Sequence, residues 1–245
     1  AYIKWRELEL VSNTMETLFN YNPTNRRISS FPIKGTCERI GNETSNSARA
    51  QELLTVQKER AEHIMIVDLV RNDLGRISTP GSVKVPRLMG LEGFKGVWHG
   101  VSTIEGTLSP NLNITDAIRA LFPGGSITGA PKRRSIELIQ EIEQQPRGFY
   151  TGSIGLIAPN GYTTLSILIR TLVKDASGWG IGVGGGIVWD SVPEREIQET
   201  WEKVSVFKAA FGPQAKYSTG SKTANELRSR AASTRSRSEA GSTIS

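Results

Sequence analysis

The chain has 245 residues, of which 37% are hydrophobic and 22% are charged, a composition typical of a globular protein rather than a disordered or fibrous one. No apolar run approaches the roughly 20 residues that a membrane helix needs, so neither a membrane span nor a membrane partner is predicted. The single cysteine, Cys37, excludes an internal disulfide and a cysteine-based metal cage, and it favours a reducing compartment such as the cytoplasm.

The net charge of +6 is unevenly distributed. Residues 213–245 contain six basic and two acidic side chains, so +4 of the +6 lies there. No aromatic residues alternate with basic ones, and no nucleic-acid partner is therefore predicted. The sequence predicts one domain over residues 1–212 and a disordered Ser/Arg-rich tail over 213–245. Because AYIKWRELEL has neither an initiator Met nor the features of a signal peptide, we expect a fragment of a longer protein.

Residues 1–36 are predicted to form a strand, a turn and a second strand. LELVS and ISSFPI are the short strand candidates, and NYNPTNRR between them is rich in turn-forming residues. PIKGT follows, and a charged residue such as Lys34 after a short apolar strand is normally solvated. Glu16, in SNTMETLF, fits equally well a solvated carboxylate at a strand end and a catalytic acid or base.

A helical pattern of apolar residues runs from about Ser47 to Asn72, with Gly75 as a plausible C-cap. Glu59 and Glu62 are three residues apart and therefore share a face of this helix. Alone, such a pair is usually a solvated acidic face. His63 points elsewhere on the helix and is interpreted as a structural residue.

GSVKVPRLMGLEGF is predicted to be a strand followed by a loop, and VWHGVSTIEGTL to be a strand. His99 lies on the apolar face of the second strand. A histidine in such a place is more often a satisfied core residue than a catalyst, although it could also donate a hydrogen bond or a proton to a substrate.

The stretch LFPGGSITGAPKRRSIELI, residues 121–139, follows the amphipathic helix ITDAIRALF, for which Thr115 is a possible N-cap. Its glycines and prolines form a turn that leads into the N-terminus of a helix, where free N–H groups and the helix dipole attract anions. Lys132, Arg133 and Arg134 add positive charge. The sequence leaves two interpretations open, an anion site and an ordinary loop before a helix.

Glycines and one arginine mark the strands that follow. Gly152 lies in FYTGSIGLIAP, where a glycine inside a strand indicates close approach of another backbone or a ligand. TTLSILIRTLVKD is predicted to be one strand, and its Arg170 must pair with a carboxylate of the protein or of a ligand. In GWGIGVGGGIVWDS the glycines 184–186 would expose N–H groups to an anion.

Pro193 opens a predicted helix, PEREIQETWEKVSVFKAAF, on which Glu196, Glu199 and Lys203 share a face. This face alone would be a surface stripe of ion pairs. If the helix faced the one that carries Glu59 and Glu62, the carboxylates would form an oxygen-rich site for a hard cation such as Mg²⁺.

The segments PIKGT, KERAEHIMIVDLVRNDLGRIS, FPGGSITGAPK, GGGIV and EREIQETWEK together resemble the chorismate-utilising enzymes, the family of anthranilate, aminodeoxychorismate and isochorismate synthases. The resemblance covers roughly residues 30–212 and implies an α+β fold, with antiparallel sheets packed as a sandwich and wrapped by helices. It also implies that the amino-terminal half of the family's component is missing from this chain.

PIKGT is similar to the aminodeoxychorismate synthase branch, in which the lysine at the position of Lys34 is a covalent nucleophile. An amine attacks only when it is unprotonated, so this role calls for burial or a nearby cation. The resemblance implies that Glu16 is a general acid or base, although the family's SPERF-like segment is altered around it. It further implies that His99 faces the substrate.

The resemblance assigns Mg²⁺ to Glu62 and Glu199, with Glu59 and Glu196 in supporting positions. The implied substrate-binding residues are Thr36, Gly125, Ser126, Thr128, Gly129, Gly152, Arg170, Gly184, Gly185 and Lys203.

The implied reaction converts chorismate and ammonia to 4-amino-4-deoxychorismate, on the way to 4-aminobenzoate and folate. A glutamine amidotransferase subunit or fused domain would supply the ammonia. Three alternatives stay open: an anthranilate synthase component I, for which a small residue at position 34 would be typical; an isochorismate synthase, which uses water; and a non-catalytic fragment.

Overall fold

A seven-stranded antiparallel sheet is organised around the long strand β7, in a computed structural model that describes residues 1–38, 57–94, 97–176 and 178–211. One edge of β7 pairs with β4 through its carboxyl half and with β5 through its amino half, while β6 pairs with the other edge. The order continues from β4 to β3, β9 and β8. The strands are β3 (Thr17–Asn22), β4 (Arg27–Phe31), β5 (Ile33–Glu38), β6 (Lys84–Phe94), β7 (Val97–Thr107), β8 (Ser153–Ile157) and β9 (Thr163–Ile167).

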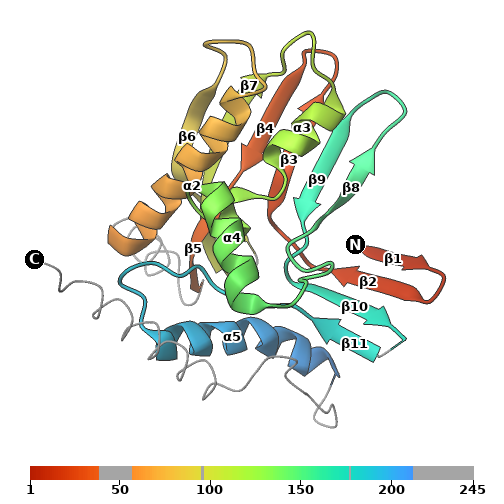
Figure 1. Cartoon of the computed structure of the whole chain (residues 1–245), viewed down its shortest axis with the longest axis vertical. Helices are drawn as coiled ribbons and strands as arrows, with labels where there is room; N and C mark the ends of the chain where they lie inside the picture. The colour runs from red at the N-terminus through yellow and green to blue at the C-terminus, as the bar shows by residue number, and fades with distance from the viewer. Residues whose placement is uncertain (39–56, 95–96, 177, 212–245) are drawn as a thin grey trace, which may run out of the picture. The chain divides into compact units, whose positions relative to one another are not determined.

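A second, four-stranded antiparallel sheet has the order β1-β2-β10-β11. Its strands are β1 (Tyr2–Trp5), β2 (Leu8–Ser12), β10 (Thr171–Asp175) and β11 (Gly178–Ile181). Figure 1 shows its two amino-terminal strands beside two strands from late in the chain. The predicted strand LELVS is confirmed as β2, but it belongs to this sheet and does not pair with the strand that contains ISSF. That strand, β4, lies between β7 and β3, and β3 was not predicted from the sequence.

Two other strand predictions are corrected. The segment TTLSILIRTLVKD is not one strand, because the chain leaves the large sheet after Ile167 and enters the small one at Thr171. Arg170 lies in the connection with a φ of 48°, a left-handed conformation that ends a strand. The loop predicted after GSVKVPRL is instead a continuation of strand β6.

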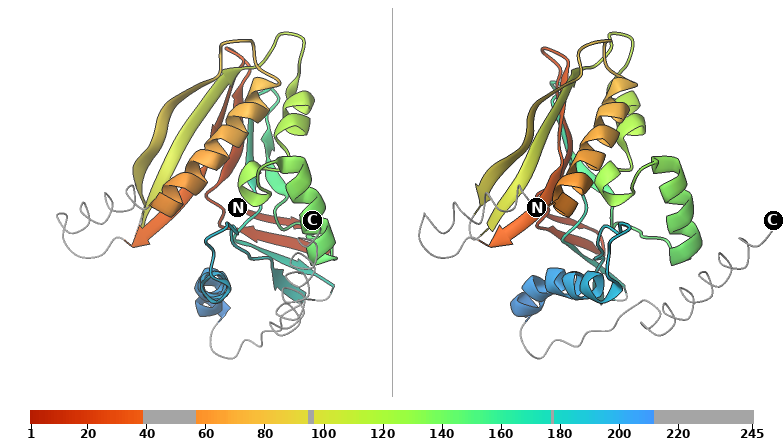
Figure 2. Two further views of the ribbon diagram at one scale, coloured as in Figure 1. Left: turned by 60° about the vertical axis from the view of Figure 1, so that its left-hand side comes forward. Right: turned by 90° about the vertical axis from the view of Figure 1, so that its left-hand side faces the viewer.

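Helices α2 (Gln57–Gly75) and α3 (Ile114–Leu121) lie along one face of the large sheet (Figures 1 and 2). The first ten residues of the helix predicted from Ser47 lie outside the described residues. The N-cap of α3 is Asn113 and not Thr115, because the Asn113 side chain accepts from the third residue of the helix while Asp116 accepts from the Asn113 N–H, which forms a complete capping box.

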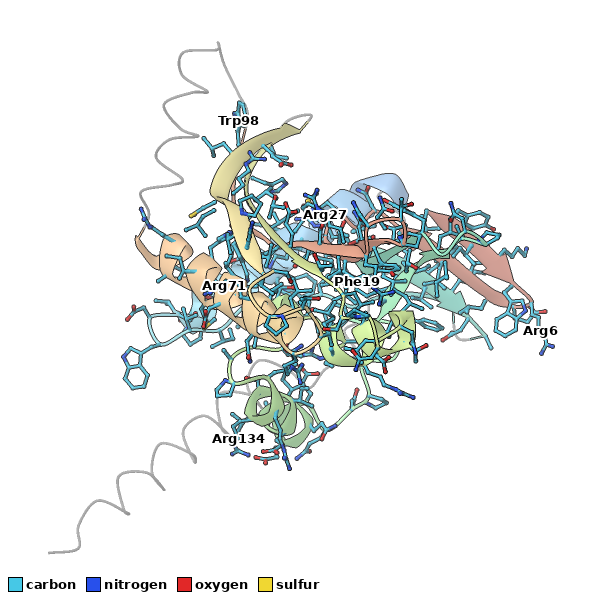
Figure 3. All side chains as sticks on the ribbon, turned by 90° about the horizontal axis from the view of Figure 1, so that it is seen from above. Arg6, Phe19, Arg27, Arg71, Trp98 and Arg134 are labelled. Atoms are coloured by element: carbon cyan, nitrogen blue, oxygen red, sulfur yellow. The ribbon has the colours of Figure 1, made fainter. Side chains whose placement is uncertain are left out.

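The hydrophobic core fills the space between these helices and the large sheet. Helix α2 contributes Ile66, Val67, Val70 and Leu74, whose spacing places them on one face, and the sheet contributes residues such as Phe19. In Figure 3 Phe19 lies among other side chains, whereas Arg6 and Arg134 lie at the periphery. Because burial of this face fixes the rotation of α2, the position of Glu62 on the helix is fixed as well.

The remaining helical elements are a short 3₁₀ helix η1 (Gly125–Ile127), α4 (Lys132–Glu143) and α5 (Pro193–Phe211). The predicted start of a helix at Pro193 is confirmed, and α4 follows the predicted turn with Pro131 as its N-cap. The chain forms one unit over Ala1–Val204 and a second over Ser205–Ser245, of which only the last residues of α5 are described. The tail predicted over 213–245 lies outside the described residues. Within the described residues, no helix has both the length and the apolar character to cross a membrane.

Candidate active site

Lys34 and Glu62 form an ion pair at the centre of the candidate site. Lys34 comes from the edge strand β5 and Glu62 from helix α2, and the distance from Lys34 Nζ to Glu62 Oε1 is 2.5 Å. The two side chains are only 18% and 12% exposed. A nucleophilic lysine was expected to be buried or to lie near a cation; Lys34 is buried, but the charged group beside it is the anion Glu62. Lys34 must therefore give up both its proton and this partner before its nitrogen can act as a nucleophile.

Of the glycines 184–186, Gly186 contacts this pair. A β-carbon at Gly186 would overlap Glu62 Oε1 and lie 3.4 Å from Lys34 Nζ, so a larger residue there would require these two side chains to move. Lys203 Nζ donates to the Gly184 carbonyl oxygen over 2.9 Å and contacts the segment from α5. Close packing at Gly186 therefore adds to any role of the N–H groups of these glycines.

Glu16 is buried close to Lys34 and to Ser126 of the signature loop, residues 122–131. Burial raises the pKa of the Glu16 carboxyl, and the Ser126 hydroxyl and the Lys34 charge oppose this rise. The buried Ser126 oxygen makes no well-formed hydrogen bond among the described residues. In this environment the carboxyl keeps its proton at a higher pH than a solvated glutamate does. The burial of Glu16 also excludes the alternative of a solvated carboxylate at a strand end.

His99 is almost completely buried on β7, where it faces Thr36 of β5 in the strand register. Its Nδ1–H donates to the Gly35 carbonyl oxygen over 3.4 Å. Burial lowers the pKa of His99, and the positive charge of Arg170 lowers it further. The imidazole is therefore neutral at pH 7, with Arg170 close enough to influence it. The side chain of Thr36 itself lies outside the described residues.

The signature loop is held by its own contacts. Thr128 Oγ1 donates to the Gly124 carbonyl oxygen over 2.9 Å, and the Gly129 N–H donates to the Gly125 carbonyl. A β-carbon at Gly125 would lie 2.8 Å from Leu69 Cδ2 of α2. Gly129 has a φ of 128°, which disfavours any other residue. The loop is thus packed tightly against α2.

The basic residues after the loop do not form an anion site with it. Lys132 Nζ lies 2.5 Å from Asp73 Oδ2, and these side chains are 15% and 5% exposed. Arg133 and Arg134 pair with acidic residues of their own helix, principally Glu137. The expected contribution of these three cations to anion binding is therefore corrected, since each already has a carboxylate partner. The pairing of Lys132 with Asp73, at the end of α2, was not predicted from the sequence.

Arg170 and Gly152 lie in the connections between strands. Arg170 was expected to pair with a carboxylate of the protein or of a ligand. Among the described residues, no protein carboxylate lies within ion-pair distance of it. At Gly152, which precedes strand β8, a β-carbon would lie 2.9 Å from the Phe149 carbonyl oxygen of the same turn. The substrate-binding role expected for Gly152 stays a prediction.

The carboxylates assigned to Mg²⁺ that the structure describes already have partners. Glu199 is 55% exposed and pairs with Lys203 over 2.7 Å, while Glu196 Oε1 accepts from Ser191 Oγ. Beside Gly185, a β-carbon would lie 3.3 Å from Glu196 Oε2. The Glu59 side chain lies outside the described residues. Across the described ranges, no three His, Cys, Asp or Glu side chains gather as metal ligands. The residues as placed do not form a ready metal site, and the Mg²⁺ assignment stays a prediction.

Known proteins resemble this chain in sequence and in structure. A family model described as chorismate binding enzyme matches residues 1–209. Aminodeoxychorismate synthase component 1 of Salmonella typhimurium is 49% identical over 181 residues, which are 74% of this chain and 40% of that protein. Anthranilate synthase component 1 1 of Haloarcula marismortui is 46% identical over 203 residues, which are 83% of this chain and 41% of that protein.

The solved structure of anthranilate synthase component I from Streptococcus pneumoniae superposes with a TM-score of 0.76 at 36% identity, covering 85% of this chain and 46% of that one. The expected α+β fold of the chorismate-utilising enzymes is thereby confirmed. The chain spans about two fifths of the length of the curated relatives named above.

Proposed function

The chain belongs to the family of chorismate-binding enzymes, and we propose that it carries the chorismate site of an aminodeoxychorismate synthase component I. The observation that carries this proposal is the place of Lys34. Its amine is largely buried and forms an ion pair with Glu62. It also lies near the Glu16 carboxyl and close to the backbone of Gly186. A lysine placed at random on an edge strand would instead extend into solvent.

The proposed reaction consists of two successive substitutions. The Lys34 nitrogen forms a bond to the ring of chorismate as the C–O bond of the 4-hydroxyl breaks, and the hydroxyl leaves as water with a proton from the protein. Ammonia then forms the new C–N bond while the bond to Lys34 breaks, and a proton passes from ammonia to the departing lysine amine. The net change is replacement of the hydroxyl by an amino group.

Glu16 is the better proton donor of the two candidates. Burial raises its pKa, so that it holds a proton closer to neutral pH than a solvated glutamate does. His99 has a lowered pKa and is neutral, and its Nδ1–H is directed at the Gly35 carbonyl. We assign His99 to a hydrogen-bonding role beside the substrate.

Arg170 is proposed to bind a carboxylate of chorismate. It is partly buried, it influences His99, and it has no carboxylate partner among the described residues. A guanidinium in such a place favours a bidentate carboxylate ligand. The signature loop and Lys203 would border the same substrate.

Mg²⁺ and an ammonia-supplying glutamine amidotransferase are further proposals that come from the family. Carboxylate oxygens suit a hard cation, but Glu62 is paired with Lys34 in this structure. Calorimetric titration of MgCl₂ into the wild type, Lys34→Ala and the double variant Lys34→Ala/Glu62→Gln tests the metal proposal. We expect tighter binding to Lys34→Ala than to the wild type, with the gain lost in the double variant. Equal binding to all three would contradict Glu62 as a ligand.

Anthranilate synthase component I is the second candidate, supported by the structural similarity to the Streptococcus pneumoniae protein. A product assay separates the two. Purified protein is incubated with chorismate, Mg²⁺ and excess ammonium, and products are identified by mass spectrometry. Formation of 4-amino-4-deoxychorismate that disappears in Lys34→Ala but not in the exposed control Lys4→Ala supports the first candidate. Anthranilate as product supports the second. Chorismate binding without any product would identify a fragment with incomplete chemistry.

A further inference from the structure

We propose that His63 is a positioning residue, which holds helix α2 against the central strand β7 next to Glu62 of the Lys34–Glu62 pair through its hydrogen bond to Ser102. This inference rests on the proposed role of Lys34. The argument begins with the ring of His63, which follows Glu62 in the chain and is 0% exposed. Its Nε2 lies 2.5 Å from Ser102 Oγ. Its Nδ1 has no hydrogen-bond partner within the described ranges, so a single bond orients the ring there.

Ser102 connects three elements at one point. Its fully buried hydroxyl contacts His63 of α2 and also accepts from the Met89 N–H of β6 over 2.8 Å. Its own N–H donates to the Pro32 carbonyl oxygen over 3.1 Å. Pro32 precedes strand β5, which carries Lys34 two residues later. The Ser102 backbone and side chain therefore join the element that carries Lys34 to the element that carries Glu62.

The two members of the ion pair are thus held through their sequence neighbours. Glu62 is adjacent to His63, and Lys34 is two residues from Pro32, so the bonds of Ser102 link the two segments that carry the pair. Gly186 packs against the same pair, since a β-carbon there would overlap Glu62 Oε1. Loss of the His63–Ser102 bond is therefore expected to displace one member of the pair relative to the other.

A purely structural role for His63 makes a different prediction from a positioning role. If His63 only filled the core, its loss would loosen the whole unit and affect every buried lysine alike. If it positions the pair, its loss would affect Lys34 first. Lys132 is the internal reference, because it is about as buried as Lys34 and is also ion-paired. Its partner Asp73 lies ten residues after His63 on α2, so the loss of the His63–Ser102 bond should not affect it.

The test compares His63→Gln with His63→Asn. The terminal amide of glutamine reaches about as far as Nε2 of histidine and can keep the bond to Ser102, whereas that of asparagine reaches only as far as Nδ1. Both full-length variants are acetylated briefly with acetic anhydride, and the labelling rates of Lys34 and Lys132 are measured by mass spectrometry. This readout requires no turnover, so it is independent of the product assay.

In His63→Asn we expect Lys34 to be labelled about tenfold faster, the factor that accompanies loss of one well-placed buried hydrogen bond. Lys132 should keep its wild-type rate, and His63→Gln should restore slow labelling of Lys34. We expect kcat to fall by about tenfold to a hundredfold in His63→Asn, because small misplacements of reacting groups are costly.

Two results would overturn the inference. Unchanged labelling of Lys34 in His63→Asn would show that the bond does not position it. Equal acceleration of Lys34 and Lys132 would show that His63 serves the stability of the whole unit. Should both substitutions at position 63 prevent folding, Ser102→Ala removes the same bond from the other side, together with the acceptor of the Met89 N–H, and is judged by the same two rates.

Discussion

At the scale of single residues, the site depends on close contacts between charged side chains and glycines. Lys34 and Glu62 neutralise each other in a buried position, and a β-carbon at Gly186 would overlap the Glu62 carboxylate. Glu16 and His99 have pKa values shifted in opposite directions by the same cause, which is burial of an ionisable group. These contacts decide which group holds a proton and which can attack.

Gly186→Ala should disrupt the Lys34–Glu62 pair, because the added methyl group would overlap the Glu62 carboxylate. Overpacking of this kind costs roughly 1–3 kcal/mol. We expect weaker chorismate binding and slower turnover, measured by calorimetry and by the product assay. Gly180→Ala is the matched control, since its β-carbon would lie 4.0 Å from the nearest atom, the Val173 carbonyl oxygen. Wild-type behaviour of Gly186→Ala would show that this segment moves away from the pair.

Glu16 should make the folded state less stable as the pH rises. The pKa of its carboxyl is raised in the folded state, so between the unfolded and the folded pKa the native protein binds more protons than the unfolded chain. The contribution of Glu16 to the free energy of unfolding is therefore fully present at a pH below the pKa of an unfolded glutamate. It is lost as the pH rises through the pKa of Glu16 in the folded state. Glu16→Gln should raise the Tm at pH 8 more than at pH 4. An equal change in Tm at the two pH values would contradict the raised pKa.

At the scale of elements, helix α2 supports both halves of the site. Its amino-terminal half carries Glu62 and His63, and its carboxyl-terminal half carries Asp73, which pairs with Lys132 after the signature loop. Its Leu69 packs against Gly125 within that loop. The helix thus sets the distance between the loop that holds Ser126 and the strand that holds Lys34.

Lys132→Met should destabilise the protein by about 3 kcal/mol, because it leaves the buried Asp73 with Arg76 alone. The free energy of unfolding is obtained from urea titrations. Arg133→Met, which removes an exposed ion pair on the same helix, should change it little. Equal effects of the two substitutions would show that the Asp73–Lys132 pair has no special role in holding the loop.

At the scale of the whole molecule, the family match ends near the end of helix α5. It covers residues 1–209, and +4 of the net charge of +6 lies beyond residue 212. Ending the chain after residue 212 should leave the affinity for chorismate unchanged, as measured by calorimetry. The same truncation should remove any salt-sensitive binding to nucleic acid. A loss of chorismate affinity would place part of the site in residues 213–245.

The positions of helices and strands were predicted from the sequence more accurately than the pairing of the strands within the two sheets. Local patterns and proline positions located β2, β7, α4 and α5, because these signals act within a few residues. The split of TTLSILIRTLVKD into two sheets depends on the left-handed backbone of Arg170, for which an apolar run gives no signal.

Within the site, the family resemblance brought forward Lys34, Glu62 and Glu16, which the structure places close together. It did not indicate that Lys132 pairs with Asp73, because such a contact over 59 positions depends on tertiary packing. Ser102 was missed as well. Its hydroxyl within an apolar strand was the available signal, but its partner His63 could be found only in the structure.

The central claim is that the Lys34 amine forms a bond to the ring of chorismate. The most direct test incubates the protein with chorismate without ammonia, followed by rapid denaturation and mass spectrometry of the peptide that contains Lys34. We predict a mass increase equal to chorismate less one water on Lys34, which disappears when ammonium is added before denaturation. Formation of 4-amino-4-deoxychorismate by Lys34→Ala at the wild-type rate, with no adduct in the wild type, would contradict the claim.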